Sequence, residues 1–259
     1  MKIFYSDVDD TLIQGAKVSQ EVEKFLKYMS SKEDFFVPCS GRPLISMTKT
    51  FANQGLEYVI AYNGGQIYDL RNNKLIYNNL IKKEQVQAIV QELENLKIDY
   101  ITYKDQIIYT NNPNNKYAQV EANLSEEPLT LIQELHATPK ILGLIDPSKN
   151  EVAIKNLKEK FTNVEIFKSK DFFIEITPFG ITKGKAVQKL NEILQLKDED
   201  TYCFGDSHND LSMFELEIHK IAVANAKAKI RELADELTTS CAENGVIKYI
   251  KNYYGELNE

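Results

Sequence analysis

Three carboxylic acids lie close together near the start of the chain, in the string Asp7-Val8-Asp9-Asp10-Thr11. The string follows the apolar run Ile3-Phe4-Tyr5, which is typical of a buried β-strand. Carboxylates at this spacing repel one another and need a cation to offset the repulsion. An EF-hand loop is excluded, because Leu12 stands where that loop requires glycine. We therefore interpret the string as a ligand site at a strand end, where open α/β sheets bind their ligands.

A second acidic string, Gly205-Asp206-Ser207-His208-Asn209-Asp210, follows the apolar run Tyr202-Cys203-Phe204. If the two strand ends are neighbours, their carboxylates form an oxygen-rich pocket of the kind that Mg²⁺ prefers. Taken alone, the second string also fits a helix N-terminus capped by Asp206 or Ser207. The occurrence of two such strings at strand ends favours the metal site.

Two further strings stand at expected helix starts. Ser40-Gly41-Arg42 offers a hydroxyl and backbone N–H groups of the kind that receive phosphate, and Thr182-Lys183-Gly184-Lys185 offers cations. Taken alone, the first also fits a helix cap, and Lys183 also fits a solvated surface lysine. The second string is not a Walker loop, because Ala186 stands where that loop requires Ser or Thr. We also find no H-E-x-x-H, G-x-S-x-G or G-x-G-x-x-G motif.

The composition is that of an ordinary globular protein, with 259 residues of which 43% are hydrophobic and 27% charged. The formal net charge of −7 argues against binding to nucleic acid or to an anionic membrane. There is no run of 18 apolar residues and no secretory pattern at the N-terminus, so we expect a cytoplasmic protein. The three cysteines are widely spaced, which argues against a disulfide scaffold or a cysteine zinc site.

Helix and strand patterns alternate at both ends of the chain, which predicts a parallel sheet. We expect strands at residues 2–6, 35–37, 58–61, 202–204 and 221–224, helices at 19–29, from 43, from 182 and around 246–250, and a hairpin between 67 and 77. Pro38 lacks an N–H group, so we expect strand pairing to stop there.

The pattern changes between residues 81 and 177, where runs of strands replace the alternation. We expect helices at 84–96, 129–136 and 150–161, and strands at 100–103, 106–109, 141–145, 164–167 and 172–176. The sequence therefore predicts an α/β core of residues 1–80 and 178–259, interrupted by an inserted α+β domain of residues 81–177.

The four strings, in this order, resemble the haloacid dehalogenase superfamily of phosphotransferases. Asp7-x-Asp9-x-Thr11 is similar to its motif I, Ser40 to motif II, Lys183 to motif III, and Gly205-Asp206-x-x-Asn209-Asp210 to motif IV. The resemblance covers residues 1–79 and 178–245. An insertion between motifs II and III is similar to the cap of the Cof-like subclass, IIB. Asn63-Gly64-Gly65 and Val223-Ala224-Asn225-Ala226 also resemble recurrent segments of that subclass, whereas Asp10 stands where glycine is commoner.

The resemblance implies a Rossmann-like parallel-sheet core with an inserted α+β cap, and it implies roles for individual residues. Asp7 is the expected nucleophile, Asp9 the general acid and base, and Lys183 the third catalytic residue. A bound Mg²⁺ is expected on the Asp7 carboxylate, the Asp9 backbone oxygen and Asp206, with Asp210 ordering its water shell. The expected phosphate-binding residues are Val8, Thr11, Ser40, Gly41, Arg42, Lys183 and Asn209.

The function implied is that of a Mg²⁺-dependent phosphatase for a small phosphorylated metabolite. A sugar phosphate is the expected substrate, with flavin mononucleotide and pyridoxal phosphate as alternatives. The alternative functions are a phosphomutase of the same superfamily and a non-catalytic module that binds a phosphorylated ligand. The carboxylate of Asp9 argues against a dehalogenase, which lacks this acid, and against a transport ATPase, which carries threonine there. The sequence leaves the oligomeric state open.

Overall fold

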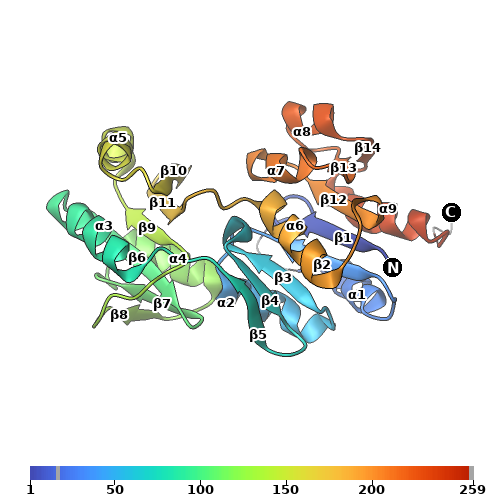
Figure 1. Ribbon diagram of the computed structural model, residues 1–259, viewed down its shortest axis with the longest axis horizontal. Helices are drawn as coiled ribbons and strands as arrows, with labels where there is room; N and C mark the ends of the chain where they lie inside the picture. Colours follow the sequence, from blue (N-terminus) through green and yellow to red (C-terminus); the bar gives the residue numbers. More distant parts are fainter. Residues whose placement is uncertain (16–17, 257–259) are drawn as a thin grey trace. The chain divides into compact units, whose positions relative to one another are not determined.

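The structure, a computed structural model, describes residues 1–15 and 18–256. The chain forms two compact units (Figure 1). The core unit consists of Met1–Tyr77 and Thr182–Glu259, and the inserted unit is Asn78–Ile181. The sequence analysis expected these boundaries after residues 80 and 177, whereas the compact units divide after Tyr77 and Ile181. The chain thus leaves the core unit once and returns to it once.

The core unit is built on an eight-stranded sheet of order β14-β13-β12-β1-β2-β3-β4-β5. Its strands are β1 (Ile3–Asp7), β2 (Phe35–Cys39), β3 (Tyr58–Ala61), β4 (Gln66–Asp69), β5 (Lys74–Asn78), β12 (Thr201–Gly205), β13 (His219–Val223) and β14 (Glu236–Thr238). From β14 to β3 every neighbouring pair is parallel, whereas β3 and β4 are antiparallel. The predicted Rossmann-like parallel sheet is confirmed, and the predicted hairpin forms its β4–β5 edge.

Helices cover both faces of this sheet, and its inner strand β1 is therefore buried on both sides. Successive side chains of a strand point to opposite faces. The ring of Phe4 lies 5.5 Å from that of Tyr253 in α9 (Gly245–Tyr253), whereas the hydroxyl of Tyr5 donates to Asn191 Oδ1 in α6 (Lys183–Leu194) at 2.9 Å. The core-unit helices are α1 (Gln20–Met29), α2 (Leu44–Phe51), α6 (Lys183–Leu194), α7 (Leu211–Phe214), α8 (Ala228–Leu233) and α9 (Gly245–Tyr253), with 3-10 turns η1 (Ala52–Gln54), η2 (Tyr62–Gly64), η4 (Asp198–Asp200), η5 (His208–Asp210) and η6 (Cys241–Glu243).

The prediction that strand pairing stops at Pro38 is wrong. Pro38 pairs with Ser6, and Cys39 pairs with Asp7, so the parallel ladder to β1 continues past the proline. The N–H of Ser40 donates to the carbonyl of Ile60 in β3, and Pro38, two residues earlier, faces that same neighbour. The missing N–H therefore removes a bond to β3, with which Cys39 pairs through Ile60, and leaves the pairing with β1 intact.

The inserted unit is an α+β fold with a six-stranded sheet of order β10-β11-β9-β6-β7-β8. Its strands are β6 (Asp99–Lys104), β7 (Ile107–Thr110), β8 (Leu129–Leu131), β9 (Ile141–Leu144), β10 (Val164–Lys170) and β11 (Phe173–Pro178), and its helices are α3 (Lys83–Asn95), α4 (Lys116–Ser125) and α5 (Asn150–Lys160), the last preceded by the 3-10 turn η3 (Pro147–Lys149). All pairings in this sheet are antiparallel except that of β7 with β8. The predicted α+β class of the insertion is confirmed.

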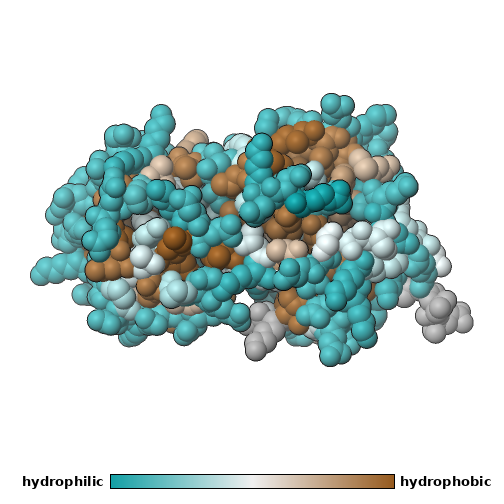
Figure 2. All heavy atoms as spheres, turned by 90° about the horizontal axis from the view of Figure 1, so that it is seen from below, coloured by the Kyte–Doolittle hydropathy of each residue, from teal (hydrophilic) through white to brown (hydrophobic). Residues whose placement is uncertain are grey.

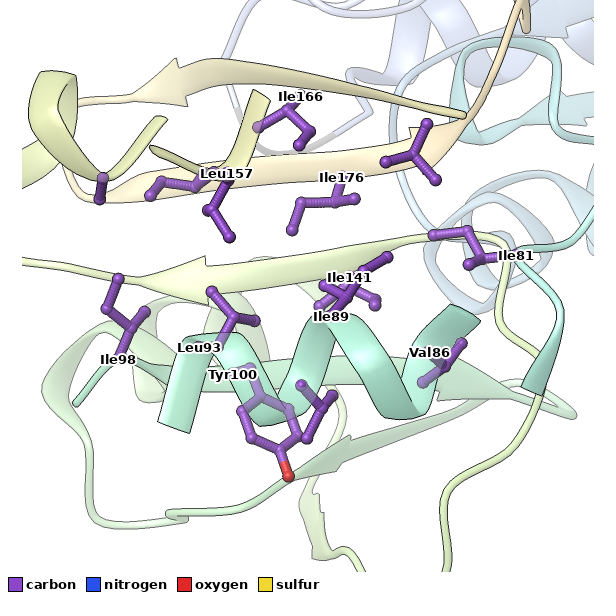
Figure 3. Packing of buried hydrophobic residues seen from close by; sticks show 14 of the residues in the cluster. Ile81, Val86, Ile89, Leu93, Ile98, Tyr100, Ile141, Leu157, Ile166 and Ile176 are labelled. Atoms are coloured by element: carbon purple, nitrogen blue, oxygen red, sulfur yellow. The ribbon is translucent and has the colours of Figure 1, made fainter. Parts of the chain in front are cut away.

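A separate hydrophobic core holds the inserted unit together. Val86, Ile89 and Leu93 repeat at helical spacing along α3 and point toward the sheet, where Ile141 and Ile176 meet them (Figure 3). All five side chains are buried. Burial of an aliphatic side chain of this size contributes about 1.5–3 kcal/mol to stability, so this core accounts for the compactness of the unit.

The predicted helix at residues 129–136 is wrong. Leu129 and Leu131 instead belong to β8, which pairs in parallel with Ile108 and Thr110 of β7. The apolar residues at 129, 131, 132 and 135 fit both a helical and an alternating spacing. The strand forms because its backbone can pair with the edge of β7. The N–H of Ile132 then donates to the carbonyl of Thr110, which continues the extended conformation.

Polar and charged residues cover much of the molecular face drawn in Figure 2, and apolar residues appear there as patches between them. In the described part of the chain, none of the helices is both long enough and apolar enough to cross a membrane.

Candidate active site

Three strand ends meet at one edge of the core sheet. β1 ends at Asp7 and lies between β2 and β12, with both pairings parallel (Figure 1). The residues that follow these strands therefore emerge side by side, as expected for the carboxyl edge of a parallel sheet. Asp7, Ser40 and Asp206 come from these three positions. The sheet thus brings together three strings that lie up to two hundred residues apart in the sequence.

A buried acidic cluster occupies this edge. Asp7, Asp206 and Asp210 each offer a carboxylate oxygen, and these oxygens lie within 4.8 Å of one another. Lys183, the first residue of α6, is fully buried and donates to Asp7 Oδ1 and, at 2.7 Å, to Asp210 Oδ1. Three carboxylates thus face one ammonium group.

The local electrostatics are those of a site with excess negative charge. Burial raises the pKa of the Asp7 carboxyl well above its usual value; Lys183 opposes this shift, and the charge of Asp210 adds to it. Burial and the charge of Asp210 also raise the pKa of Asp206. Burial alone would lower the pKa of Lys183, but Asp210 and Asp7 outweigh it and keep the ammonium charged. A hard dication would offset the two remaining negative charges, so the donor set fits Mg²⁺.

Asp210 organises the loop that carries Asp206. One carboxylate oxygen, Oδ2, accepts the backbone N–H groups of Asp206 and Ser207 at 3.0 and 2.9 Å, while Oδ1 accepts Lys183. The loop passes so close to this side chain that a Cβ on Gly205 would lie 2.8 Å from Asp210 Cβ. Both oxygens of Asp210 thus have protein partners, and its observed contacts are those of a residue that positions Asp206 and Lys183.

Thr11 is buried, and its hydroxyl donates to Asp206 Oδ1 at 3.0 Å. Val8 is also buried, and its carbonyl accepts the N–H groups of Leu12 and Ile13. These bonds turn the chain sharply after β1. The structure therefore places both predicted phosphate-binding residues at the acidic cluster, with the Thr11 hydroxyl directed at a carboxylate.

Asp9 and Arg42 form a two-pronged ion pair beside the cluster. Arg42 Nε donates to Asp9 Oδ2 at 3.0 Å and Nη2 donates to Oδ1 at 2.5 Å, a geometry that fixes the orientation of both groups. The buried Ser40 hydroxyl lies 3.5 Å from the same Oδ2 and accepts the N–H of Arg42 at 3.2 Å. Arg42 therefore contacts the predicted acid and base directly.

Asn209 is exposed, and its side chain donates to the side chain of Asn63 at 3.2 Å. Asn63 did not appear among the site residues expected from the sequence. Asn225 was also missed: its side chain donates to the carbonyl of Asp10 and accepts the N–H of Cys241. Their positions could have indicated both residues. Each asparagine lies just past the end of a predicted strand, in a segment that resembles recurrent parts of the superfamily.

The chain belongs to the haloacid dehalogenase-like hydrolase family, whose model matches residues 4–250. This match confirms the resemblance inferred from the sequence. The match runs through both units.

Curated relatives are named phosphatases. The chain is 28% identical over 96% of its length to the 5-amino-6-(5-phospho-D-ribitylamino)uracil phosphatase YwtE of Bacillus subtilis, of which 97% is covered. It is 24% identical to the phosphatase YwpJ of the same organism, with 97% of this chain and 99% of the relative covered. The chain is accordingly a phosphatase of the haloacid dehalogenase family.

Solved structures share the fold over nearly the whole chain. The protein TM0651 of Thermotoga maritima superposes with a TM-score of 0.87 at 27% identity, with 97% of each chain covered. The subclass IIB sugar phosphatase BT4131 superposes with a TM-score of 0.76 at 21% identity, with 99% and 100% covered. Both comparisons extend over the inserted unit, which therefore has the place in the chain and the fold that it has in these two structures.

Proposed function

We propose that the protein is a Mg²⁺-dependent phosphatase that hydrolyses a small phosphorylated metabolite through a covalent aspartyl phosphate on Asp7. The observation that carries this proposal is the buried cluster of Asp7, Asp206, Asp210 and Lys183 at the carboxyl edge of the core sheet. A nucleophilic carboxylate, a buried cation and an acid two residues along the chain are the groups that in-line phosphoryl transfer requires.

In the first step, Asp7 attacks phosphorus through one carboxylate oxygen, and the bond from phosphorus to the ester oxygen breaks. Asp9, once it has left Arg42 and taken up a proton from solvent, gives that proton to the leaving oxygen. In the second step, Asp9 takes a proton from water as the water attacks phosphorus, and the bond from phosphorus to Asp7 breaks. Free phosphate leaves, and both aspartates return to their starting states.

The remaining residues hold charge and geometry during both steps. Lys183 contacts Asp7, and its ammonium group stabilises the negative charge as that charge shifts between the nucleophile and the phosphoryl oxygens. Ser40, Gly41 and Asn209 are the proposed donors to the phosphoryl oxygens. A bound Mg²⁺, held by Asp7, the Asp9 backbone oxygen and Asp206, would offset the repulsion between the nucleophile and the dianionic ester.

A sugar phosphate or a phosphorylated sugar alcohol is the proposed substrate class. The name of the relative YwtE specifies a phosphorylated ribityl chain, and the similar structure BT4131 is described as a sugar phosphatase. We assign the choice of leaving group to the inserted unit, because the proposed nucleophile, acid, metal ligands and Lys183 all belong to the core unit.

A phosphate-release screen tests the proposal. The panel contains hexose and pentose phosphates, phosphorylated ribitylamino compounds, flavin mononucleotide and pyridoxal phosphate, each with Mg²⁺ and with excess chelator. We expect Mg²⁺-dependent release from at least one sugar-type ester and none from the Asp7→Asn variant. Turnover that requires a bisphosphorylated activator and releases little phosphate would instead indicate a phosphomutase. Tight binding of the esters without turnover would indicate a binding module.

A further inference from the structure

Three consecutive residues in the turn after β3 adopt the left-handed backbone conformation. The φ angles of Tyr62, Asn63 and Gly64 are 52°, 54° and 103°. Glycine adopts this region freely and asparagine more readily than most residues, whereas a tyrosine there is unusual. Such a run persists only where the surrounding structure determines it, and strained backbone of this kind gathers at functional sites.

This turn contacts the strings that the other site residues come from. The N–H groups of Tyr62 and Asn63 donate to the carbonyls of Arg42 and Ser40 at 3.0 and 2.9 Å. A Cβ on Gly64 would lie 2.3 Å from the carbonyl of Thr182, the residue before Lys183. The backbone of the turn is therefore fixed against two parts of the proposed active site.

The side chain of Asn63 reaches a third part. Its Oδ1 accepts the amide of Asn209 at 3.2 Å. Its terminal amide also lies against Gly41, where a Cβ would be 3.0 Å from both Nδ2 and Oδ1. Asn63 thus lies between Gly41 and Asn209, two of the proposed phosphoryl-binding residues.

We propose that Asn63 is a positioning residue of the phosphoryl site, whose carboxamide fixes the direction of the Asn209 amide and closes over Gly41. This inference rests on the proposed function. The bond to Asn209 joins a half-buried residue to an exposed one, where a neutral hydrogen bond adds little to folding.

The test replaces Asn63 with glycine, which removes the carboxamide and keeps the left-handed backbone without strain. Asn73→Gly is the matched control. Asn73 also has a positive φ, of 52°, and its side chain accepts the hydroxyl of Tyr68 in the β4–β5 turn. Asn63→Gly removes an amide that contacts Asn209, whereas Asn73→Gly removes an amide that contacts Tyr68.

Four quantities are measured for each variant: kcat and KM for the best ester of the panel, the Kd of orthovanadate in the presence of Mg²⁺ by calorimetry, and the melting temperature. For Asn63→Gly we expect kcat to fall by about 10–100-fold and vanadate to bind about tenfold more weakly, as for other residues that orient a ligand-binding group. Its melting temperature is expected to fall no further than that of Asn73→Gly, whose kcat and vanadate affinity stay at parent values.

A double variant tests whether Asn63 acts through Asn209. If it does, Asn63→Gly combined with Asn209→Ala loses no more activity than Asn209→Ala alone, because the single change already removes the interaction. Losses that simply add would overturn the assignment.

The outcomes separate this inference from the proposed function. Parent-level turnover and vanadate binding in Asn63→Gly would overturn the inference and leave the phosphatase intact. If the parent hydrolyses no ester, the proposed function fails, and the vanadate affinities alone decide the role of Asn63. If the parent binds no vanadate with Mg²⁺, both fail. A much lower melting temperature for Asn63→Gly than for Asn73→Gly would show a merely structural residue.

Discussion

The buried ammonium group of Lys183 lies among the three carboxylates of Asp7, Asp206 and Asp210 in the core unit. Replacing Asp7 with asparagine removes one negative charge and the proposed nucleophile together. We expect phosphate release to fall by roughly a thousandfold or more, as for other covalent nucleophiles. The melting temperature is expected to rise or stay level, because burial and the charge of Asp210 disfavour the ionised Asp7 carboxyl. Phosphate release and a melting curve on the same sample check both expectations.

The matched control is Asp10→Asn, which removes an exposed acid from the same string. The control should keep parent turnover within a few fold. Activity of the Asp7→Asn variant within tenfold of the parent would contradict the assignment of Asp7 as nucleophile.

The same charge imbalance predicts a stabilising cation. At a concentration of 100 times its Kd, a ligand that binds only the folded protein raises the free energy of unfolding by about 2.7 kcal/mol. We expect Mg²⁺ to raise the melting temperature of the chelator-treated protein and to restore its activity, and Ca²⁺ to bind but to support little turnover. Asp206→Asn should lose most of the Mg²⁺-induced shift. Full turnover in excess chelator would exclude the metal role.

At the scale of elements, the position of Lys183 depends on how closely α6 approaches α7. The N–H of Gly184 donates to Ser212 Oγ at 3.0 Å, and a Cβ at this glycine would lie 2.0 Å from the backbone oxygen of Ser212. The helices must therefore move apart in Gly184→Ala. We expect unfolding free energy to fall by about 1–3 kcal/mol, as for other overpacked sites, and activity to fall as Lys183 shifts.

Gln188→Ala, at an exposed position of the same helix, is the control and should stay within about 0.5 kcal/mol of the parent. Denaturant unfolding of the three proteins measures the difference. Equal stability of Gly184→Ala and Gln188→Ala would show that the helix pair adapts to the added methyl group.

Strand order makes a further prediction about the cysteines. Cys39 in β2 and Cys203 in β12 lie on either side of β1, and strands two apart are about 9–10 Å from each other, beyond disulfide reach. All three cysteines are free and buried, and burial raises the pKa of Cys39 to about 12. Thiol titration of the denatured, unreduced protein should find three thiols, and a loss of two would contradict this strand order.

Elements with a strong apolar period were predictable from the sequence, and those without one were not. Helix α3 buries Val86, Ile89, Val90 and Leu93, and its predicted span agrees with the structure within one residue at each end. Helix α4 was missed because its buried face is Ala118, Glu121, Ala122 and Ser125, which gives no hydrophobic period. Strand β14 was missed because its three residues are mostly exposed.

The candidate site shows the same division. Its acids and Lys183 could be predicted from the sequence. Their charged residue types indicate metal and phosphate chemistry, and the predicted strand ends indicate where the acids lie. Asn63 was not, because its role depends on a left-handed backbone and on a partner 146 residues away. The pairing of Arg42 with Asp9 was likewise hidden, since either side chain could have faced phosphate instead.

For the whole molecule, the division into units predicts that the proposed chemistry survives without the insertion. Replacing residues 83–175 by a short flexible linker should leave a folded core unit that hydrolyses a small activated phosphoester, while the preferred metabolite loses its advantage. Kinetics on a monodisperse sample, compared with those of the full chain, measure the change. A folded core that binds Mg²⁺ yet is inert toward every phosphoester would place an essential group in residues 83–175.

The central place of β1 in the core sheet also has a consequence for how the protein is made. Its neighbour β12 is encoded after the whole inserted unit, so a growing chain exposes one unpaired edge of β1 until residues 201–205 leave the ribosome. At ordinary rates of synthesis this interval lasts roughly 10–40 s, and the complete inserted unit leaves the ribosome about 1–5 s before β12 does, so it can fold first. The nascent chain therefore passes through a stage with one finished unit and one open sheet, and at that stage it is most in need of a chaperone.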